Sequence, residues 1–491
     1  MGGMVGGRRR GKGAGAGPAL VTACALLGLG GTAAAQAPAT SPGGTAAAQA
    51  PARGEAVVST AFPAPGVDPL APYVREALAG NLELRQQRLA EGAAAERVAQ
   101  SRGRFLPSLS VQARYTETSG VLDLGQLINP AYAALNRLTG TTAFPTNVSA
   151  TLPYRRETML HLEQPLLQPA LAANHSLQRS LSGIESLRTA AAARRLGAQV
   201  RTTYFGCASA ARVVDLYRTT LPVLDENVRV NERLVANGKA TPDAVLRARA
   251  ERATVAQQLM DAERQRDAAE EYLSLLLDRP LDTPVVLLPD SLFDEPLPAT
   301  LDESLASARA HREELGQAEL GVRAAQAQGR LALSSFLPSV AVAVDYGFQG
   351  QSYRFDTRND VAIASVVLQW NLFNGGQDAA RRSEAVLERD RAELRQEEAS
   401  RQVALEAEQA WRAADVAWRA IATAGERLAA ARRGFELVQR RYAEGVASQL
   451  EFLDARTAYT TSAVNEVLSR YEYATRRAEL VRAAALGPAV P

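Results

Sequence analysis

The sequence predicts a mainly α-helical protein with a small β-sheet, in which one structural unit occurs twice along the chain. Three observations lead to this prediction. Two stretches, 170–236 and 377–443, keep a helical pattern over many turns. Four short segments, two in each half of the chain, alternate apolar and polar residues. The helical and alternating segments follow each other in the same order in both halves. Aromatic residues make up only 5% of the chain, as is typical of long helices rich in Ala, Arg, Glu and Leu.

The N-terminus has the features of an export signal peptide. Basic residues at 8–12 precede an apolar stretch at 18–31, and Ala33, Ala34 and Ala35 supply the small residues of a cleavage site. Removal of residues 1–35 places the mature chain outside the cytoplasm. Residues 36–71 are then expected to be a flexible leader.

Cysteine usage leaves two readings of the N-terminus open. Val21–Cys24 is a loose lipobox, so the alternative is cleavage before Cys24 and a lipid-anchored chain. Cys24 itself lies inside the expected signal, and Cys207 lies in a predicted helix. A chain from which residues 1–35 are removed therefore keeps one thiol and forms no intramolecular disulfide.

The charge balance excludes a nucleic-acid-binding surface. The chain has 55 Lys and Arg against 53 Asp and Glu, and the signal contains four of the basic residues and none of the acidic ones. The mature chain is therefore close to neutral and slightly acidic, without the basic excess that nucleic-acid partners require.

Catalytic and metal-binding patterns are missing from the sequence. His161, His175 and His311 have no metal-ligand spacing, and no G-x-S-x-G motif occurs. We therefore expect neither an enzyme nor a cofactor or metal site.

An internal duplication defines the domain organisation. Residues 84–115 align with 315–346 and share Phe-Leu-Pro-Ser. The pairs 160–167 with 366–373 and 234–249 with 442–456 follow at a nearly constant offset. The boundaries that follow are a first repeat, an inter-repeat segment and a second repeat at 72–277, 278–300 and 301–486.

Four strands are predicted from period-two alternation. They cover about 105–118, 156–167, 336–348 and 360–373. One face of each is apolar and the other is small or polar, which is typical of a membrane barrel with a wet lumen, although a soluble sandwich strand shows the same pattern. The residues expected to face the membrane are Leu109, Val111, Tyr115, Leu160, Leu162, Val340, Val342, Val344, Tyr346, Val366, Leu368 and Trp370.

The long helices carry heptad seams. In the first, an apolar residue recurs every seven positions at Val200, Cys207, Val214, Leu221, Val228 and Val235. The second has two seams, one at Ala414, Ile421, Leu428, Phe435 and Tyr442 and one at Val403, Ala410, Ala417, Ala424, Ala431 and Val438. Two seams indicate neighbours on two sides, as in a cylinder of helices, whereas an ordinary coiled coil needs one. We also expect a bend at Pro222.

Each long helix is expected to end in a glycine turn and return as a shorter helix. The turns are 237–239 and 444–446, and the return helices cover about 243–277 and 449–485, with Thr241 and Ser448 as N-caps.

The strand count predicts an oligomer. Membrane barrels need at least about eight strands, and open strand edges are not tolerated in hydrocarbon. Four strands per chain therefore require several chains to share one barrel. No apolar run after the signal is long enough to span a membrane as a helix.

This order of segments closely resembles the outer-membrane factor family, the TolC-like channels, over about residues 70–486. The markers are the duplicated Phe-Leu-Pro-Ser, the strand exit at 370–376, and the turn at 442–445 with Leu450, Leu453, Asp454 and Ala455 after it. The resemblance implies a homotrimer with a 12-strand β-barrel and a 12-helix α-barrel. It also implies an outer-membrane exit duct that reaches into the periplasm, serving efflux or type I secretion together with a periplasmic adaptor and an inner-membrane pump of RND, ABC or MFS type. The alternative is an envelope coiled-coil scaffold or tethering protein.

The resemblance also assigns roles to residues at the turns. Glu451 and Asp454 match acidic gate positions, and the resemblance suggests that Arg247 pairs across an interface in the closed state, with Tyr442 adding a hydrogen bond. Adaptor docking is expected at Gly238, Lys239, Ala240, Gly445, Val446 and Ala447. Outer-membrane lipid would surround the strands, and residues 120–155 and 349–359 would be extracellular loops.

Overall fold

The computed structural model describes residues 68–117, 123–148, 156–290, 295–350 and 360–487. The expected signal, the leader up to residue 67 and Cys24 lie outside the described residues. The first half contains α1 (Ala71–Gly80), α2 (Leu82–Gly103), β1 (Ser108–Tyr115), α3 (Gly125–Thr139), β2 (Arg156–Leu167), α4 (Pro169–Ala236) and α5 (Pro242–Leu277). The second half contains α6 (Leu301–His311), α7 (Glu313–Ser334), β3 (Ser339–Gly350), β4 (Asp360–Gln369), α8 (Gln377–Ala443) and α9 (Gln449–Ala483).

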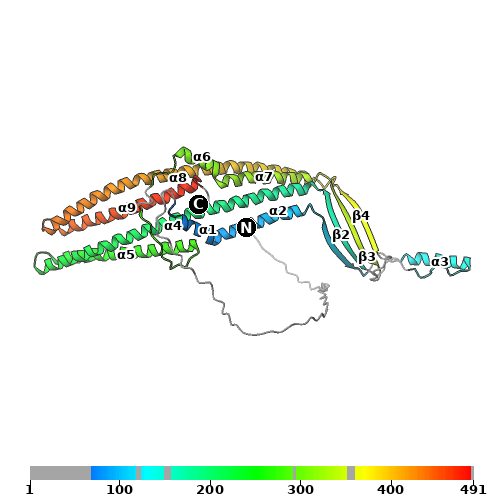
Figure 1. The fold of residues 1–491 in the computed structure, drawn as a ribbon, viewed down its shortest axis with the longest axis horizontal. Helices are drawn as coiled ribbons and strands as arrows, with labels where there is room; N and C mark the ends of the chain where they lie inside the picture. Colours follow the sequence, from blue (N-terminus) through cyan, green and yellow to red (C-terminus); the bar gives the residue numbers. More distant parts are fainter. Residues whose placement is uncertain (1–67, 118–122, 149–155, 291–294, 351–359, 488–491) are drawn as a thin grey trace, which may run out of the picture. The chain divides into compact units, whose positions relative to one another are not determined.

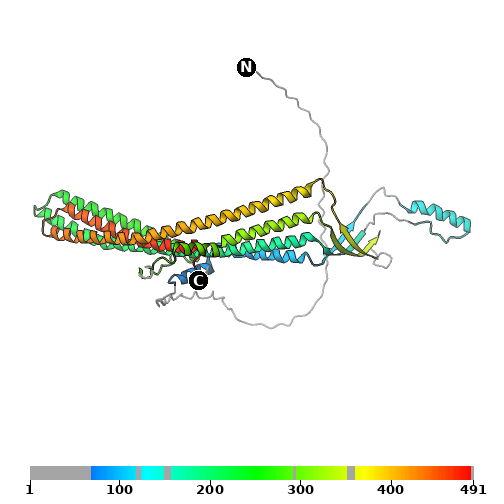
Figure 2. The ribbon, with the colours of Figure 1, turned by 90° about the horizontal axis from the view of Figure 1, so that it is seen from above.

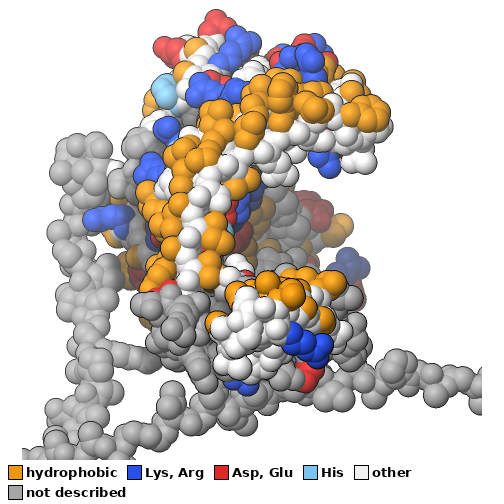
Figure 3. Space-filling model, turned by 90° about the vertical axis from the view of Figure 1, so that its right-hand side faces the viewer, with side chains coloured by type: hydrophobic (Ala, Val, Ile, Leu, Met, Phe, Trp, Pro, Cys, Tyr) orange, Lys and Arg blue, Asp and Glu red, His pale blue; other side chains and the backbone are white. Residues whose placement is uncertain are grey.

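The four strands form one antiparallel sheet in the order β1-β2-β3-β4. Its register pairs Leu109 with Leu162 and Val111 with Leu160, and Leu160 in turn with Tyr346. Because directly opposed residues share a face, the apolar positions of all four strands form one continuous face. Figure 3 shows this face as a run of hydrophobic side chains along the arched sheet.

The opposite face of the sheet is more polar. It carries His161 beside Asp345, with 2.6 Å between the imidazole Nδ1 and a carboxylate oxygen, and Glu163 with its carboxylate 3.8 Å from the imidazole Nε2. β1 and β4 are the two edges, and each pairs with only one strand. The sheet of a single chain is therefore open on both sides.

The strands differ in their limits from the sequence prediction. The first and third are expected from Phe105 and Phe336 but begin three residues later, because the Phe-Leu pair before each proline still bonds to the preceding helical turn. The fourth ends at Gln369, so Trp370 lies just outside it and donates its indole N–H to the carbonyl of Phe336 over 3.1 Å.

The helices form a layer in which α4 has neighbours on both sides. Along its C-terminal part it packs against α5 and α9, and along its N-terminal part against α2 and α7. α8 packs against α9 and α7. Figures 1 and 2 show the α4–α5 and α8–α9 hairpins side by side, at the end of the long helices away from the strands. No helix within the described ranges is both long and apolar enough to cross a membrane.

The main core lies near the middle of α4. Val200, Tyr204 and Cys207 are fully buried there against α1, α5 and α9. Burial raises the pKa of the Cys207 thiol to about 12, so this cysteine stays protonated and unreactive. The inter-repeat segment crosses the same region, where the Tyr204 hydroxyl donates to the carbonyl of Val286 and accepts from the amide of Leu288.

A buried ion network joins four elements of the second half. Arg312, at the break between α6 and α7, has only 5% of its side chain exposed. It bonds to both carboxylate oxygens of Glu314, to Glu406 on α8 at 2.8 Å, and to the carbonyl of Ala483 on α9 at 2.8 Å. Arg482 binds the other oxygen of Glu406. The network therefore fixes α6, α7, α8 and α9 at one point.

Replacing Arg312 with Ala is expected to lower the free energy of unfolding by about 1–3 kcal/mol, because it leaves the half-buried carboxylates of Glu314 and Glu406 without this cation and the carbonyl of Ala483 without its donor. Urea unfolding followed by circular dichroism measures this change. Arg401→Ala is the control, since Arg401 is exposed and pairs with Glu397 on the same helix; its effect should stay below about 0.5 kcal/mol. Equal losses in the two variants would contradict a structural role for the network.

Candidate functional site

The two helical turns have the same backbone form. Gly238 and Gly445 adopt left-handed backbone angles, with φ of +67° and +76°. The amides of Lys239 and Val446 bond back to the carbonyls of Leu234 and Arg441, each at 2.8 Å. Because residues other than glycine and asparagine adopt this conformation only with strain, glycine is needed at both turns.

The six residues expected to dock a partner differ in accessibility. Gly238, Lys239, Gly445 and Val446 are exposed, and Ala240 is half-buried. Ala447 is buried, with 7% of its surface exposed, so it supports the turn from within. The accessible surface of the two tips is therefore smaller than the sequence suggests.

The two acidic residues of α9 lie in its first turns and are exposed. Ser448 caps the helix, since its hydroxyl accepts the Glu451 amide over 3.2 Å. Asp454 follows three residues later, so both carboxylates are on one face of the helix. Thr241 also occupies an N-cap position, on α5, but its side chain makes no capping bond to the helix backbone.

Arg247 is paired within its own helix. Its guanidinium lies 3.2 Å from the Asp243 carboxylate, one turn earlier on α5, and both side chains are exposed. A hydrogen bond from Thr241 and the charge of Arg247 lower the pKa of Asp243. Within the described part of the chain, no ion pair connects Arg247 to Glu451 or Asp454.

Tyr442 links the second hairpin to the first. Its hydroxyl donates to the side-chain oxygen of Asn231 on α4 over 3.2 Å, and its ring stacks on Phe452 of α9 with centroids 4.8 Å apart. Asn231 and Phe452 are both buried. Neither was identified from the sequence, although Phe452 lies between the two acidic positions.

Two further contacts join the hairpins. The Gln449 side chain donates to the carbonyl of Ala244 on α5 over 2.7 Å. Arg456 on α9 is 3% exposed and lies 3.8 Å from Glu251 on α5, while its Nε and one Nη have no hydrogen-bond partner. Burial lowers the pKa of Arg456.

The internal repeat explains this unusual arginine. Its counterpart in the first repeat, Arg249, pairs with Glu232 on the adjacent long helix over 2.7 Å. The residue at the equivalent place on α8 is Gln439, so Arg456 has no acidic partner within its own hairpin and turns to Glu251. Comparison of the two repeats, position by position, shows in the sequence that Arg456 lacks the acidic partner of its counterpart, but it does not identify Glu251 as the residue that Arg456 approaches.

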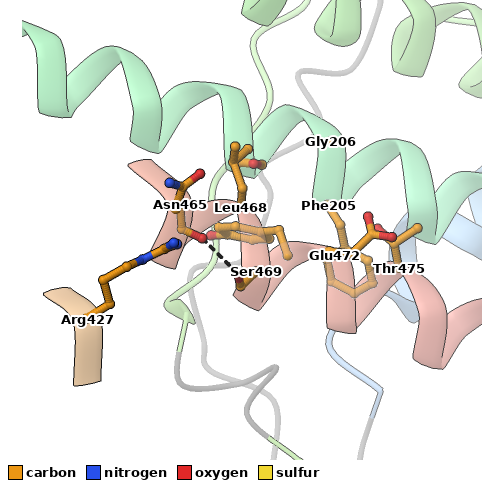
Figure 4. Close-up of a pocket in the computed structure, with 10 residues that line it drawn as sticks. Phe205, Gly206, Arg427, Asn465, Leu468, Ser469, Glu472 and Thr475 are labelled. Carbon is orange, nitrogen blue, oxygen red and sulfur yellow. Dashed lines mark hydrogen bonds between the residues drawn. The ribbon is translucent and has the colours of Figure 1, made fainter. Parts of the chain in front are cut away.

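One cavity lined by described residues lies away from the tips. It has a volume of about 480 Å³ and lies between α4 and α9, with Arg427 reaching it from α8 (Figure 4). Gly206 and Ser209 on α4 leave room for it. The Ser469 hydroxyl on its wall is satisfied by the carbonyl of Asn465.

The sequence of this chain matches the family model described as outer membrane efflux protein over residues 73–279 and 305–486, and the chain belongs to this family. The family consists of outer-membrane efflux channels, and its members are not enzymes. No curated protein matches the sequence.

Solved structures of low sequence identity share the fold. A membrane protein from Pseudomonas aeruginosa is 21% identical, with a TM-score of 0.71 over 84% of this chain and 93% of that one. The open state of the Neisseria gonorrhoeae MtrE outer membrane channel is 20% identical, with a TM-score of 0.69 over 84% and 88%. The Campylobacter jejuni CmeC outer membrane channel is 17% identical, with a TM-score of 0.69 over 84% and 85%.

Proposed function

We propose that this chain is the outer-membrane exit duct of a tripartite efflux or type I secretion system, and that three copies form one channel. The observation that carries this proposal is the four-stranded sheet, which has one continuous apolar face and two open edges. Open edges expose backbone N–H and C=O groups that lipid cannot satisfy. A neighbouring copy supplies the missing strand at each edge.

Rotational symmetry supports closure of the sheet into a barrel. The edges are different strands, β1 and β4, so the contact between copies is head to tail and closes as a ring. Three copies give 12 strands, above the minimum of about eight for a membrane barrel. The helices are open in the same sense, since the main contacts of α8 among the described residues are with α6, α7 and α9. α2 and α5 of the next copy are the complementary edge.

The two faces of the sheet suit this arrangement. The apolar face includes Val111, Val366 and Leu368, which are 69%, 71% and 64% exposed in the single chain. We assign this face to outer-membrane lipid. The opposite face, with His161 and Asp345, then lines an aqueous lumen.

At the far end of the helices we place the gate. Three copies of Glu451 and Asp454 form a ring of six carboxylates, which concentrates negative potential where the duct is narrowest and attracts cations. The contacts of Tyr442 with Asn231 and of Gln449 with Ala244 hold the two hairpins together in the closed state. Arg247 pairs with Asp243 on the same helix and stabilises the tip of its own hairpin.

The exposed tips are the docking surface for the adaptor. Gly238, Lys239, Gly445 and Val446 protrude at the periplasmic end, where an adaptor joins the duct to an inner-membrane pump. In this assembly the pump supplies the energy, and the role of this chain is passive conduction.

Bilayer recordings of the purified protein test both the channel and its gate. Wild-type trimers should conduct and be blocked by multivalent cations from the side of the tips. Replacing Glu451 and Asp454 together with Ala should relieve this block, because it removes the ring of carboxylates. The control is Asp261→Ala with Asp267→Ala, two exposed acidic residues farther along α5. A protein without conductance would overturn the channel, whereas unchanged block would remove only these two residues from the gate.

A further inference from the structure

The segment between β1 and β2 contains a folded excursion with an uncovered apolar face. Helix α3 (Gly125–Thr139) is followed by a return segment, 140–148, that runs back along it. The sequence predicts only a loop over the whole of 120–155. The structure thus adds an element at the end of the strands away from the long helices.

Side-chain amides hold the return segment on one side of α3. Asn129 exchanges two hydrogen bonds with the backbone of Val148, both at 2.8 Å, and Asn136 does the same with Phe144, at 2.8 and 3.0 Å. Gly125 permits the close approach, because a Cβ there would lie 1.8 Å from the carbonyl oxygen of Val148. Asn129 and Asn136 are seven residues apart, so they mark one face of the helix.

The uncovered apolar face lies on a different side of α3 from Asn129 and Asn136, and its residues have coiled-coil spacing. Its apolar residues follow each other at alternating steps of four and three, in the order Leu124, Ile128, Ala131, Leu135 and Leu138. This is the a/d pattern of a helical seam. Leu138 is 84% exposed and Leu135 40% exposed in the single chain. A helix of this length is marginal in water unless another surface covers such a face.

Charge argues against lipid as the cover. Helices that lie on anionic membrane surfaces have Lys and Arg along the polar face. The polar side of α3 has Arg137 as its single charge beside neutral Gln126, Asn129 and Asn136. The nearest carboxylate, Asp123, accepts the backbone amide of Gly125 over 2.8 Å. A strict a/d seam on a nearly neutral helix favours another helix of the same kind.

The chain segments that connect α3 to the strands are long enough for the three copies of α3 to meet. Residues 116–124 lead from β1 to the helix, and nine residues span at most about 30 Å. A barrel of 12 tilted strands has a radius of about 12 Å from the strand spacing and tilt. Three-fold symmetry puts the three helices at one height, where each can reach the axis.

We infer that the three α3 helices of one channel pack against each other through this seam and form a three-helix cap at the outer mouth. The inference rests on the proposed trimer. Leu127 and Ala134 flank the seam, which widens the apolar surface as an assembly of more than two helices needs.

Disulfide crosslinking in purified trimers tests the cap. Leu135→Cys and Leu138→Cys, made singly, should convert monomer bands to dimer bands on denaturing gels after mild oxidation. Gln126→Cys and Arg137→Cys, on the outer side of the same helix, are the matched controls and should remain monomeric. The chain with only its native cysteines is the blank, and Cys207 is buried in it.

The outcomes separate this inference from the proposed channel. Heat-modifiable trimers in which positions 135 and 138 crosslink no faster than position 126 would overturn the cap and leave the channel intact. A fluorophore at position 138 that shifts to the blue only when lipopolysaccharide vesicles are added would identify lipid as the cover and also overturn it. If the wild-type protein forms no trimers, the channel and the cap both fail.

Discussion

Replacing Gly347 with Ala is expected to abolish assembly of the channel. Gly347 lies in β3 opposite β2, and a Cβ there would meet the carbonyl oxygen of Thr158 at 2.0 Å and Cα of Met159 at 2.7 Å. Backbone atoms of a paired strand cannot move aside without breaking the ladder. The variant should therefore lose the heat-modifiable trimer band in outer-membrane fractions.

Gly329→Ala is the matched control for this substitution. Gly329 lies within α7, and a Cβ there meets nothing within 4 Å. The same methyl group should raise stability there by up to about 1 kcal/mol, because alanine favours the helix. Trimers in normal amount from Gly347→Ala would contradict the observed pairing of β2 with β3.

The sequence predicts the strands because their pattern depends on local alternation. The apolar residues at 340, 342, 344 and 346 alternate with small or polar ones, and the register places the same faces together across the sheet. The duplication predicts the order of elements for a similar reason, since each half repeats the same local signals. The limits of α4 and α8 at Ala236 and Ala443 agree with the glycine turns.

The heptad seams show what periodicity leaves open. Val200, Cys207 and Val214 are buried in the single chain, whereas Leu221, Val228 and Val235 are only half-buried. The pattern identifies the apolar side of the helix but not the element that covers it. The helix is also continuous through Pro222, which the sequence marks as the site of a bend.

Long-range polar contacts could not be predicted from the sequence. Arg312 binds Glu406, 94 residues away, and Arg456 approaches Glu251 across 205 positions. Ion pairs within one helix turn, such as Arg247 with Asp243, have a spacing that the sequence displays. Helix α3 was missed because Pro130 and the surrounding polar residues obscure its seam.

Replacing Gly445 with Val is expected to abolish export while trimers still form. Gly445 has a φ of +76° at the exposed turn between α8 and α9, and a Cβ there meets no atom within 4 Å. A β-branched residue in this conformation costs about 1–2 kcal/mol, which the turn relieves by changing its path. Because the turn lies far from the sheet, barrel assembly should be unaffected. Export by cells with the full pump and adaptor measures the loss, and trimer bands give the control.

Gly445→Asn distinguishes the shape of the turn from the bulk of its side chain. Asparagine adopts left-handed backbone angles with little strain, so this variant keeps the turn but adds a side chain to the exposed tip. If an adaptor packs closely against the tip, export should fall in both variants, because the added atoms block the contact. If the Gly445→Asn variant supports normal export and the Gly445→Val variant does not, the turn geometry is what matters, and it acts through the position of Tyr442 against Asn231. Normal export by both variants would remove this tip from the docking surface and leave the α4–α5 turn at Gly238 as the contact.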